Sequence, residues 1–487
     1  MKRENMHDTI TGVREGPVTE GKKRPARRRW VCLAAGVLAA VLAVSLLLPT
    51  EGSPAGVLPV PTARAAALAV AEYPEMAPSP NESVYEKEGG TFDDVGYMEA
   101  YAAWNKDVRA QGQYREGCQG AVDSFFAASL PQFLGSSGGE NRLYSPLNVY
   151  LALGMLAEVT EGDSRAQILT LLDCPDLETL RSRASSLWNV NYCDDGASAS
   201  ILASSLWLDE GVAFRQETLD TLAEVYYASS YQGQMGSGEL NEALRQWLND
   251  QTGGLLENQI GDIELDAQTI LALASTIYFR AKWRDEFSES RTDTGVFHGA
   301  AGDTACDFMH QSRSQNYYWA DRFSAISRGL ESGGEMWLLL PDEGVSVDDL
   351  LTSGEAAEFL LRSGDWEKEK YFVVNLSLPK FDVSSRLDLK EGLQDLGVTD
   401  VFDSGRSDFS PLVEHGEGIY VTEVRHDARV AIDEEGVTAA AYTVIPTAGA
   451  AMPPEEEVDF VLDRPFLFAI TGPGGAPLLF AGVVNQA

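Results

Sequence analysis

Hydrophobic spacing divides the chain from about Cys118 onward into helices followed by strands. Helical spacing of apolar residues comes early, in "AVDSFFAASLPQFL", "SPLNVYLALGMLAEV" and "NEALRQWLNDQTGG". The pair Ser145-Pro146 predicts the start of the second helix, and Gly253-Gly254 predicts the end of the third. Strand patterns come later, in "TILALASTIYFRAKW", "EMWLLLP", "YFVVNLSLPKF" and "VDFVLDRPFLFAIT". This order indicates an α+β protein with large antiparallel or mixed sheets.

The N-terminal part of the chain has a different pattern. Residues 1–29 carry nine Lys/Arg and four Asp/Glu, and residues 30–48 are an uncharged, mostly apolar run. At about 1.5 Å per residue a helix of this length spans a hydrocarbon core of roughly 30 Å, and basic residues before it stay inside. The sequence predicts a cytoplasmic tail at 1–29 and a transmembrane signal anchor at 30–48, with a cleaved signal peptide as the alternative. Most of the chain is then extracytoplasmic, either membrane-anchored or secreted.

Residues 49–117 are rich in Pro, Ala, Glu and Gly, which is typical of a spacer. A short helix is possible in "DDVGYMEAYAAWNKDVRAQGQ", where Tyr97, Tyr101 and Trp104 share one helical face. The folded domain is predicted at 118–487.

Composition excludes several classes of function. The net charge of −37 argues against nucleic-acid binding, which depends on clustered basic residues. No HExxH, GxSxG, GxGxxG or phosphate-loop motif occurs, so the sequence indicates no enzyme, metal or cofactor. The five cysteines include no CxxC pair. A Cys174–Cys193 disulfide and free buried thiols both remain open.

One segment near the C-terminus is unusually poor in bulky residues: "DEEGVTAAAYTVIPTAGAAMPP", residues 433–454. In an extended chain Val437, Ala439 and Ala441 share one face, while Tyr442 lies on the other. By itself such a stretch is typical of a loose linker or an edge strand.

The segment and its surroundings resemble the serpin family. The quoted segment is preceded, in the family's order, by "NRLYSPLNVYLALGML", "TIYFRAKWRDEF", "LPKFDVSSRLDLKEGLQDLGVTDVF" and "VRHDARVAI", and followed by "DRPFLFAI". The resemblance implies the serpin fold, with three β-sheets, about eight or nine helices and an exposed reactive-centre loop. It also implies a suicide substrate. In this mechanism a serine or cysteine protease cuts the loop and is trapped as a covalent acyl complex when the loop inserts into the main sheet. We expect a monomer.

The resemblance assigns roles to individual residues. Counted from Glu434, the family's usual loop length places the reactive bond at Ala450–Ala451, within the window Ala448–Met452. A small residue before this bond favours elastase-like or subtilisin-like targets over trypsin-like ones. The implied hinge consists of Glu434, Glu435, Gly436, Val437, Thr438, Ala439, Ala440 and Ala441.

Two further groups are implied at the main sheet. Lys380 and Glu434 would form an ion pair at its top, the breach, close to Trp283. Ser145, Asn148 and His426 would lie in the shutter below its middle. Ser275 replaces the family's usual Asn there, so the usual Asn–His hydrogen bond is in doubt. Val437 and Pro446 also depart from the family pattern, which leaves a non-inhibitory serpin, a binding or surface protein, as the alternative.

Overall fold

The structure is a computed structural model. It describes residues 65–87, 91–111, 118, 120, 122–254, 261, 263–331, 333–362, 364–414, 418–422, 424–437, 456–472 and 478–487. The expected tail and apolar segment at 1–48 lie outside these ranges, as do residues 438–455 of the expected loop. Within the ranges described, no helix is both long and apolar enough to cross a membrane.

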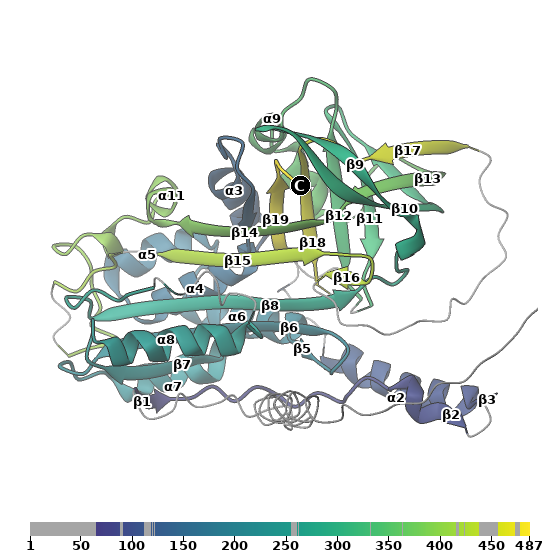
Figure 1. Cartoon of the computed structure of the whole chain (residues 1–487). Coiled ribbons are helices and arrows are strands. Elements are labelled where there is room, and N and C mark those ends of the chain that lie inside the picture. Colours follow the sequence, from purple (N-terminus) through teal and green to yellow (C-terminus); the bar gives the residue numbers. More distant parts are fainter. Residues whose placement is uncertain are drawn as a thin grey trace, which may run out of the picture. The chain divides into compact units, whose positions relative to one another are not determined.

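The first sheet has eight strands in the order β1-β7-β6-β8-β16-β15-β14, with β5 paired to β6. Figure 1 shows β7, β6, β8, β15 and β14 side by side, with β16 at one end of β8 and β15. Its strands are β1 (Ala66–Ala69), β5 (Cys193–Asp194), β6 (Ala199–Asp209), β7 (Ala228–Gly233), β8 (Leu271–Lys282), β14 (Phe381–Asp388), β15 (Arg425–Ile432) and β16 (Gly436–Val437).

The second sheet has nine strands in the order β17-β13-β10-β11-β12-β18-β19-β4, with β9 paired to β10. It is continuous because the long strand β10 pairs with β9 and β13 and then, at Tyr318 and Trp319, with β11. A third, two-stranded sheet, β2-β3, lies in the N-terminal segment. These strands are β2 (Glu86–Lys87), β3 (Thr91–Phe92), β4 (Arg142–Tyr144), β9 (Thr292–Gly299), β10 (Gly302–Trp319), β11 (Phe323–Gly329), β12 (Glu335–Pro341), β13 (Glu369–Pro379), β17 (Glu457–Val461), β18 (Phe466–Thr471) and β19 (Leu478–Val484).

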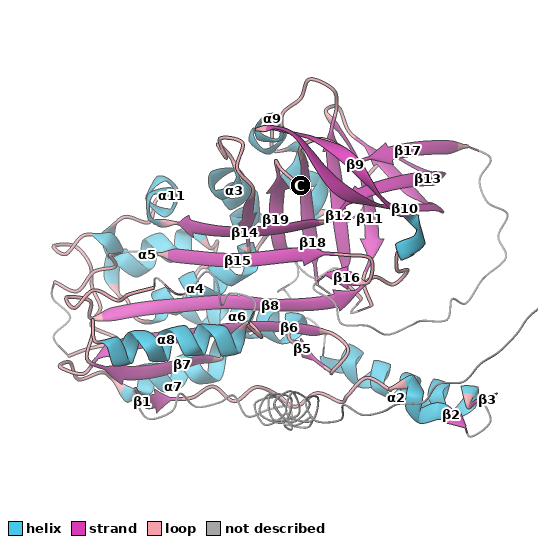
Figure 2. Ribbon diagram, in the orientation of Figure 1, coloured by secondary structure: helices cyan, strands magenta, loops and turns pink. Residues whose placement is uncertain are grey.

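The described part of the chain contains ten α-helices, close to the eight or nine expected, and the fold class is α+β as predicted. Figure 2 shows α8 in front of the first sheet and α4 behind it, and both helices contact β8. The α-helices are α2 (Asp94–Gln111), α3 (Asp123–Leu134), α4 (Pro146–Glu158), α5 (Gly162–Leu171), α6 (Leu177–Asn191), α7 (Gln216–Val225), α8 (Gly238–Gln251), α9 (Val347–Thr352), α10 (Glu355–Leu361) and α11 (Lys390–Asp395). Three 3₁₀ turns are η1 (Glu82–Tyr85), η2 (Glu289–Arg291) and η3 (Asp400–Phe402).

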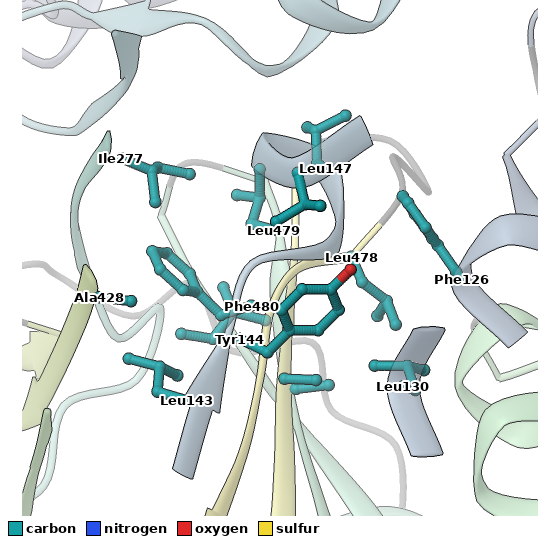
Figure 3. Packing of buried hydrophobic residues seen from close by; sticks show 14 of the residues in the cluster. Phe126, Leu130, Leu143, Tyr144, Leu147, Ile277, Ala428, Leu478, Leu479 and Phe480 are labelled. Atoms are coloured by element: carbon teal, nitrogen blue, oxygen red, sulfur yellow. The ribbon is translucent and has the colours of Figure 1, made fainter. Parts of the chain in front are cut away.

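Helix α4 lies in the centre of the core. It starts where the sequence predicts, with Pro146 in its first turn and the Ser145 hydroxyl accepting the Asn148 N–H. Nearly all of its residues are buried, which is typical of a helix enclosed on all sides. Figure 3 shows Leu147 of α4 among side chains of β4, β8, β15 and β19, including Tyr144 and Phe480. This central helix packs against the face of the first sheet that carries β8 and β15.

Part of the expected spacer is folded. Residues Ala66–Ala69 form β1, the edge strand next to β7. The expected helix is α2, on which the rings of Tyr97, Tyr101 and Trp104 follow one another at 6.2 and 5.4 Å. All four cysteines outside the apolar segment are free thiols, so the structure contains no Cys174–Cys193 disulfide.

Candidate functional site

Along most of their length, β8 and β15 of the first sheet are not joined by any strand that the structure describes. One edge of β8 pairs with β6 along its length, from Leu271 to Arg280. On the other edge, the two residues of β16 pair with Ala281 and Lys282 and also join β15. Along 271–280 no described strand pairs with that edge. We call the position between β8 and β15 next to this edge the slot.

Cavities border the slot on both faces of the sheet. One of about 60 Å³ lies on the α4 side, and one of about 170 Å³ lies on the α8 side. Both are lined by Leu271, Leu273, Ser275 and Arg425. Apolar residues on both faces of the first half of β8 are typical of a strand buried on both sides, but residues 271–275 are only half-buried. The two cavities that border this half of the strand account for the difference.

The chain enters the slot through a tight turn after β15. Asp433 Oδ1 accepts the backbone N–H groups of Glu435 and Gly436 at 2.9 and 3.1 Å. A Cβ atom at Gly436 would lie 2.4 Å from the Ala281 carbonyl oxygen, so only glycine fits beside β8. Val437 follows and is fully buried in the main core. The turn therefore directs the chain between β8 and β15.

The expected ion pair is present at this end of the slot. Lys380 Nζ lies 2.7 Å from Glu434 Oε2, and the Thr292 hydroxyl donates to Glu434 Oε1 at 2.7 Å. Burial opposes ionisation of Glu434, but the hydrogen bonds from Lys380 and Thr292 outweigh it and hold its pKa below the ordinary value. The contact fixes the turn to β14, whose first residue, Phe381, follows Lys380.

Trp283 also holds the turn. Its indole N–H donates to the Asp433 carbonyl at 2.8 Å, and its backbone N–H donates to the Glu435 carbonyl at 2.9 Å. Arg328, which the sequence analysis missed, lies with its guanidinium 6.0 Å from the Trp283 ring and 4.9 Å from the Phe287 ring. Burial lowers the pKa of Arg328 to about 10, so it stays charged at neutral pH. Nothing in the local sequence marks Arg328, because its partners come from other elements.

Below the middle of the slot, hydrogen bonds connect the four expected residues in a row, because Ser145 and Asn148 are also bonded to each other at the start of α4. Ser275 Oγ donates to Asn148 Oδ1 at 2.5 Å and lies 3.1 Å from Ser204 Oγ. His426 Nε2 accepts the Ser145 backbone N–H at 3.0 Å. Among the residues described, no hydrogen bond joins His426 to Ser275. The Ser275 hydroxyl bonds to Asn148 instead.

Residues 121–487 match the family described as "Serpin (serine protease inhibitor)". The chain belongs to the serpin family. Serpin-Z2A of Oryza sativa subsp. japonica is 29% identical over 398 residues, covering 72% of this chain and 92% of its own. Human leukocyte elastase inhibitor is 29% identical over 372 residues, covering 74% and 96%.

Solved serpin structures share the fold. The thermophilic serpin Tengpin in its native state is 23% identical with a TM-score of 0.68, covering 77% of this chain and 95% of that one. Thyroxine-binding globulin in complex with thyroxine is 22% identical with a TM-score of 0.64, covering 75% and 98%. At these identities the likeness concerns the fold alone.

Several assigned residues of this serpin lie outside the described part of the chain. They are Thr438, Ala439, Ala440 and Ala441 of the hinge and Ala450 and Ala451 of the reactive bond. Their roles remain predictions. Glu434 to Val437 are described, and they lead into the slot.

A serine, a histidine and an aspartate of this serpin also meet on the second sheet. His310 Nδ1 lies 2.9 Å from Ser377 Oγ, and His310 Nε2 lies 3.2 Å from Asp293 Oδ1. In hydrolase triads the serine faces Nε2 and the acid faces Nδ1, the reverse of this arrangement. Asp293 is 79% exposed here, whereas a triad acid is buried. The geometry differs in both respects from a nucleophilic triad.

The shutter histidine predicts a pH dependence. Burial lowers the pKa of His426 to about 4, from an unfolded value of about 6.5. The unfolded chain then binds more protons than the folded one between these values, so stability falls as the pH drops below about 6.5. Between pH 7 and pH 5 this one group should remove about 2 kcal/mol of stability. The urea-unfolding midpoint of the protein and of His426→Gln at both pH values measures it. Equal pH slopes in the two proteins would contradict the assignment.

Proposed function

We propose that this serpin irreversibly inhibits serine endopeptidases by inserting its cleaved loop into the slot between β8 and β15. The observation that supports this most is the path of the hinge. Gly436 and Val437 already pair with β8 at the end of the slot, and the edge of β8 that no described strand covers continues from there. Cleavage in residues 438–455 would release one end of the loop and let the strand extend along that edge.

The energetics favour insertion. As a central strand, residues 437–449 would form roughly two hydrogen bonds per residue, each with a net gain of about 1 kcal/mol, against about 1–2 kcal/mol per residue for ordering the backbone. With the apolar contacts on both faces, the balance is on the order of 10 kcal/mol. Since a typical fold is stable by about 5–15 kcal/mol, an uncut loop held outside the sheet is a kinetically trapped state.

The side chains on the inserting strand fit the space available. Val437 faces the main core, so Ala439 and Ala441 follow on the same inward face if the strand continues. Continuing the β16–β8 register places them opposite Phe279 and Ile277 of β8, which are buried, so small side chains suit this face. Tyr442 would point to the opposite face.

The proposed targets follow from the reactive bond. Alanine at both Ala450 and Ala451 suits proteases with shallow specificity pockets, and a trypsin-like pocket would find no cation. The relative named leukocyte elastase inhibitor agrees with this class of target. The basic segment before the apolar run supports an extracytoplasmic location, either anchored or secreted.

Incubating the full-length protein in detergent with an elastase and with subtilisin tests the proposal. We expect a complex that survives boiling in SDS, and a released C-terminal peptide that begins at Ala451. Trypsin is the matched control and should form much less complex. Cleavage of the loop by both expected proteases without any complex would contradict inhibition and favour the non-inhibitory alternative.

A further inference from the structure

A segment N-terminal to the serpin domain is attached to the outer edge of the first sheet. Strand β1 pairs antiparallel with β7, from Ala66 opposite Gln232 to Ala69 opposite Ser230. Two side chains of the domain reinforce the attachment. Ser229 Oγ accepts the Ala71 N–H at 3.1 Å, and the Gln216 amide donates to the Leu68 carbonyl at 3.0 Å. We call residues 65–79 the strap.

The strap then passes from the sheet edge to helix α6. The Tyr73 ring lies 5.1 Å from Trp188, 5.6 Å from Tyr192 and 6.1 Å from Tyr227, measured between ring centroids. Trp188 belongs to α6 and donates its indole N–H to the Leu202 carbonyl of β6, while Tyr227 directly precedes β7. The ring of Tyr73 therefore contacts the junction of α6 with two strands of the sheet.

The far end of the strap is also bonded. The Ser79 N–H donates to the Asp195 carbonyl at 2.8 Å, and the Asp194 N–H donates to Met76 Sδ at 3.1 Å. Both partners lie at the end of β5. The strap thus connects β7, the α6 junction and β5, all on the same side of the slot.

If the slot opens by a shift of β8, the strands bonded to β8 must move with it. Strands lie about 4.8 Å apart, so a full strand between β8 and β15 requires these two to stand roughly 9–10 Å apart. Strands β8, β6 and β7 are hydrogen-bonded to one another, so they shift as a group over α6. Because packed layers resist such sliding, a segment bonded to both layers raises the barrier.

We propose that the strap restrains opening of the slot and so keeps the loop out of the sheet until a protease cuts it. This inference rests on the proposed function, because it requires a slot that accepts a strand. The strap also covers the edge of β7, which would otherwise be exposed for pairing with another chain.

The experiment measures how fast the full-length protein takes up a labelled synthetic peptide with the sequence of residues 437–449, by fluorescence anisotropy. In Tyr73→Ala uptake should be faster by about tenfold or more, because three aromatic contacts are lost. Ala71→Pro removes the N–H that bonds to Ser229 and should accelerate uptake to a smaller extent. It serves as the second variant if Tyr73→Ala does not fold.

Two controls isolate the strap. Tyr73→Phe keeps the ring and should match the unaltered protein. Tyr85→Ala removes an aromatic residue that contacts Tyr97, in the same N-terminal region, and should also have no effect. Equal uptake rates in every folded variant would refute the proposed role of the strap. They would leave the proposal that the slot accepts a strand unaffected. No uptake by any form, the unaltered protein included, would instead refute the slot as a strand acceptor, and with it both proposals.

Discussion

Replacing Ala439 by arginine should turn the inhibitor into a substrate. Val437 is fully buried and faces the core, so the side chain two residues later enters on the same face of an inserting strand. An unpaired guanidinium there would cost several kcal/mol to bury, which slows insertion and lets the protease complete hydrolysis first. We expect at least about tenfold less SDS-resistant complex with the same protease, since each 1.4 kcal/mol changes a rate ratio tenfold.

Ala440→Arg is the matched control. It adds the same charge one residue later, on the face that points away from the core by strand alternation. Complex formation should remain close to that of the unaltered protein, and loop cleavage should occur in both variants. An equal loss of complex in both would show that the charge acts on protease docking and would contradict face-specific insertion.

Nicking the loop should make the protein markedly more heat-stable. Unfolding of a domain of this size carries an entropy of about 2.1 cal/mol/K per residue, so each 1 kcal/mol raises the midpoint by roughly 1–2 °C. A gain on the order of 10 kcal/mol from strand insertion then raises the midpoint by about 10 °C or more. Differential scanning calorimetry of the intact and nicked proteins, at one scan rate, measures the shift.

The nicked Ala439→Arg variant is the control for this measurement, because it is cut at the same bond but hindered in insertion. It should show a much smaller increase. A nicked unaltered protein that melts at or below the intact midpoint would favour the non-inhibitory alternative. Pro446, which lacks a backbone N–H, should limit the gain at the far end of the strand.

Much of the fold could be predicted because the elements that carry it are locally encoded. The start of α4 follows from Ser145 and Pro146, whose capping and conformational preferences act within one turn. The Lys380–Glu434 ion pair, although remote in sequence, could be predicted only through the family resemblance. The structure adds a hydrogen bond that the resemblance did not imply, from the Thr292 hydroxyl to the Glu434 carboxylate.

Other features could not be predicted because they depend on contacts between distant segments. Residues 66–69 are Ala and Leu, and nothing in their pattern distinguishes an edge strand from a spacer; only the free edge of β7 decides it. The sequence showed that Ser275 replaces Asn, but not that its hydroxyl would turn to Asn148 and Ser204. The buried charge of Arg328 likewise depends on rings from the segment after β8.

Hydrogen–deuterium exchange of the intact and nicked proteins tests most directly whether the slot receives the loop. If the slot receives the loop, the amides of residues 438–449 exchange rapidly before cleavage and become strongly protected afterwards, together with those of β8 along 271–280. If the amides of residues 438–449 still exchange rapidly after cleavage, the loop has not become a strand of the sheet, and the proposed mechanism is wrong.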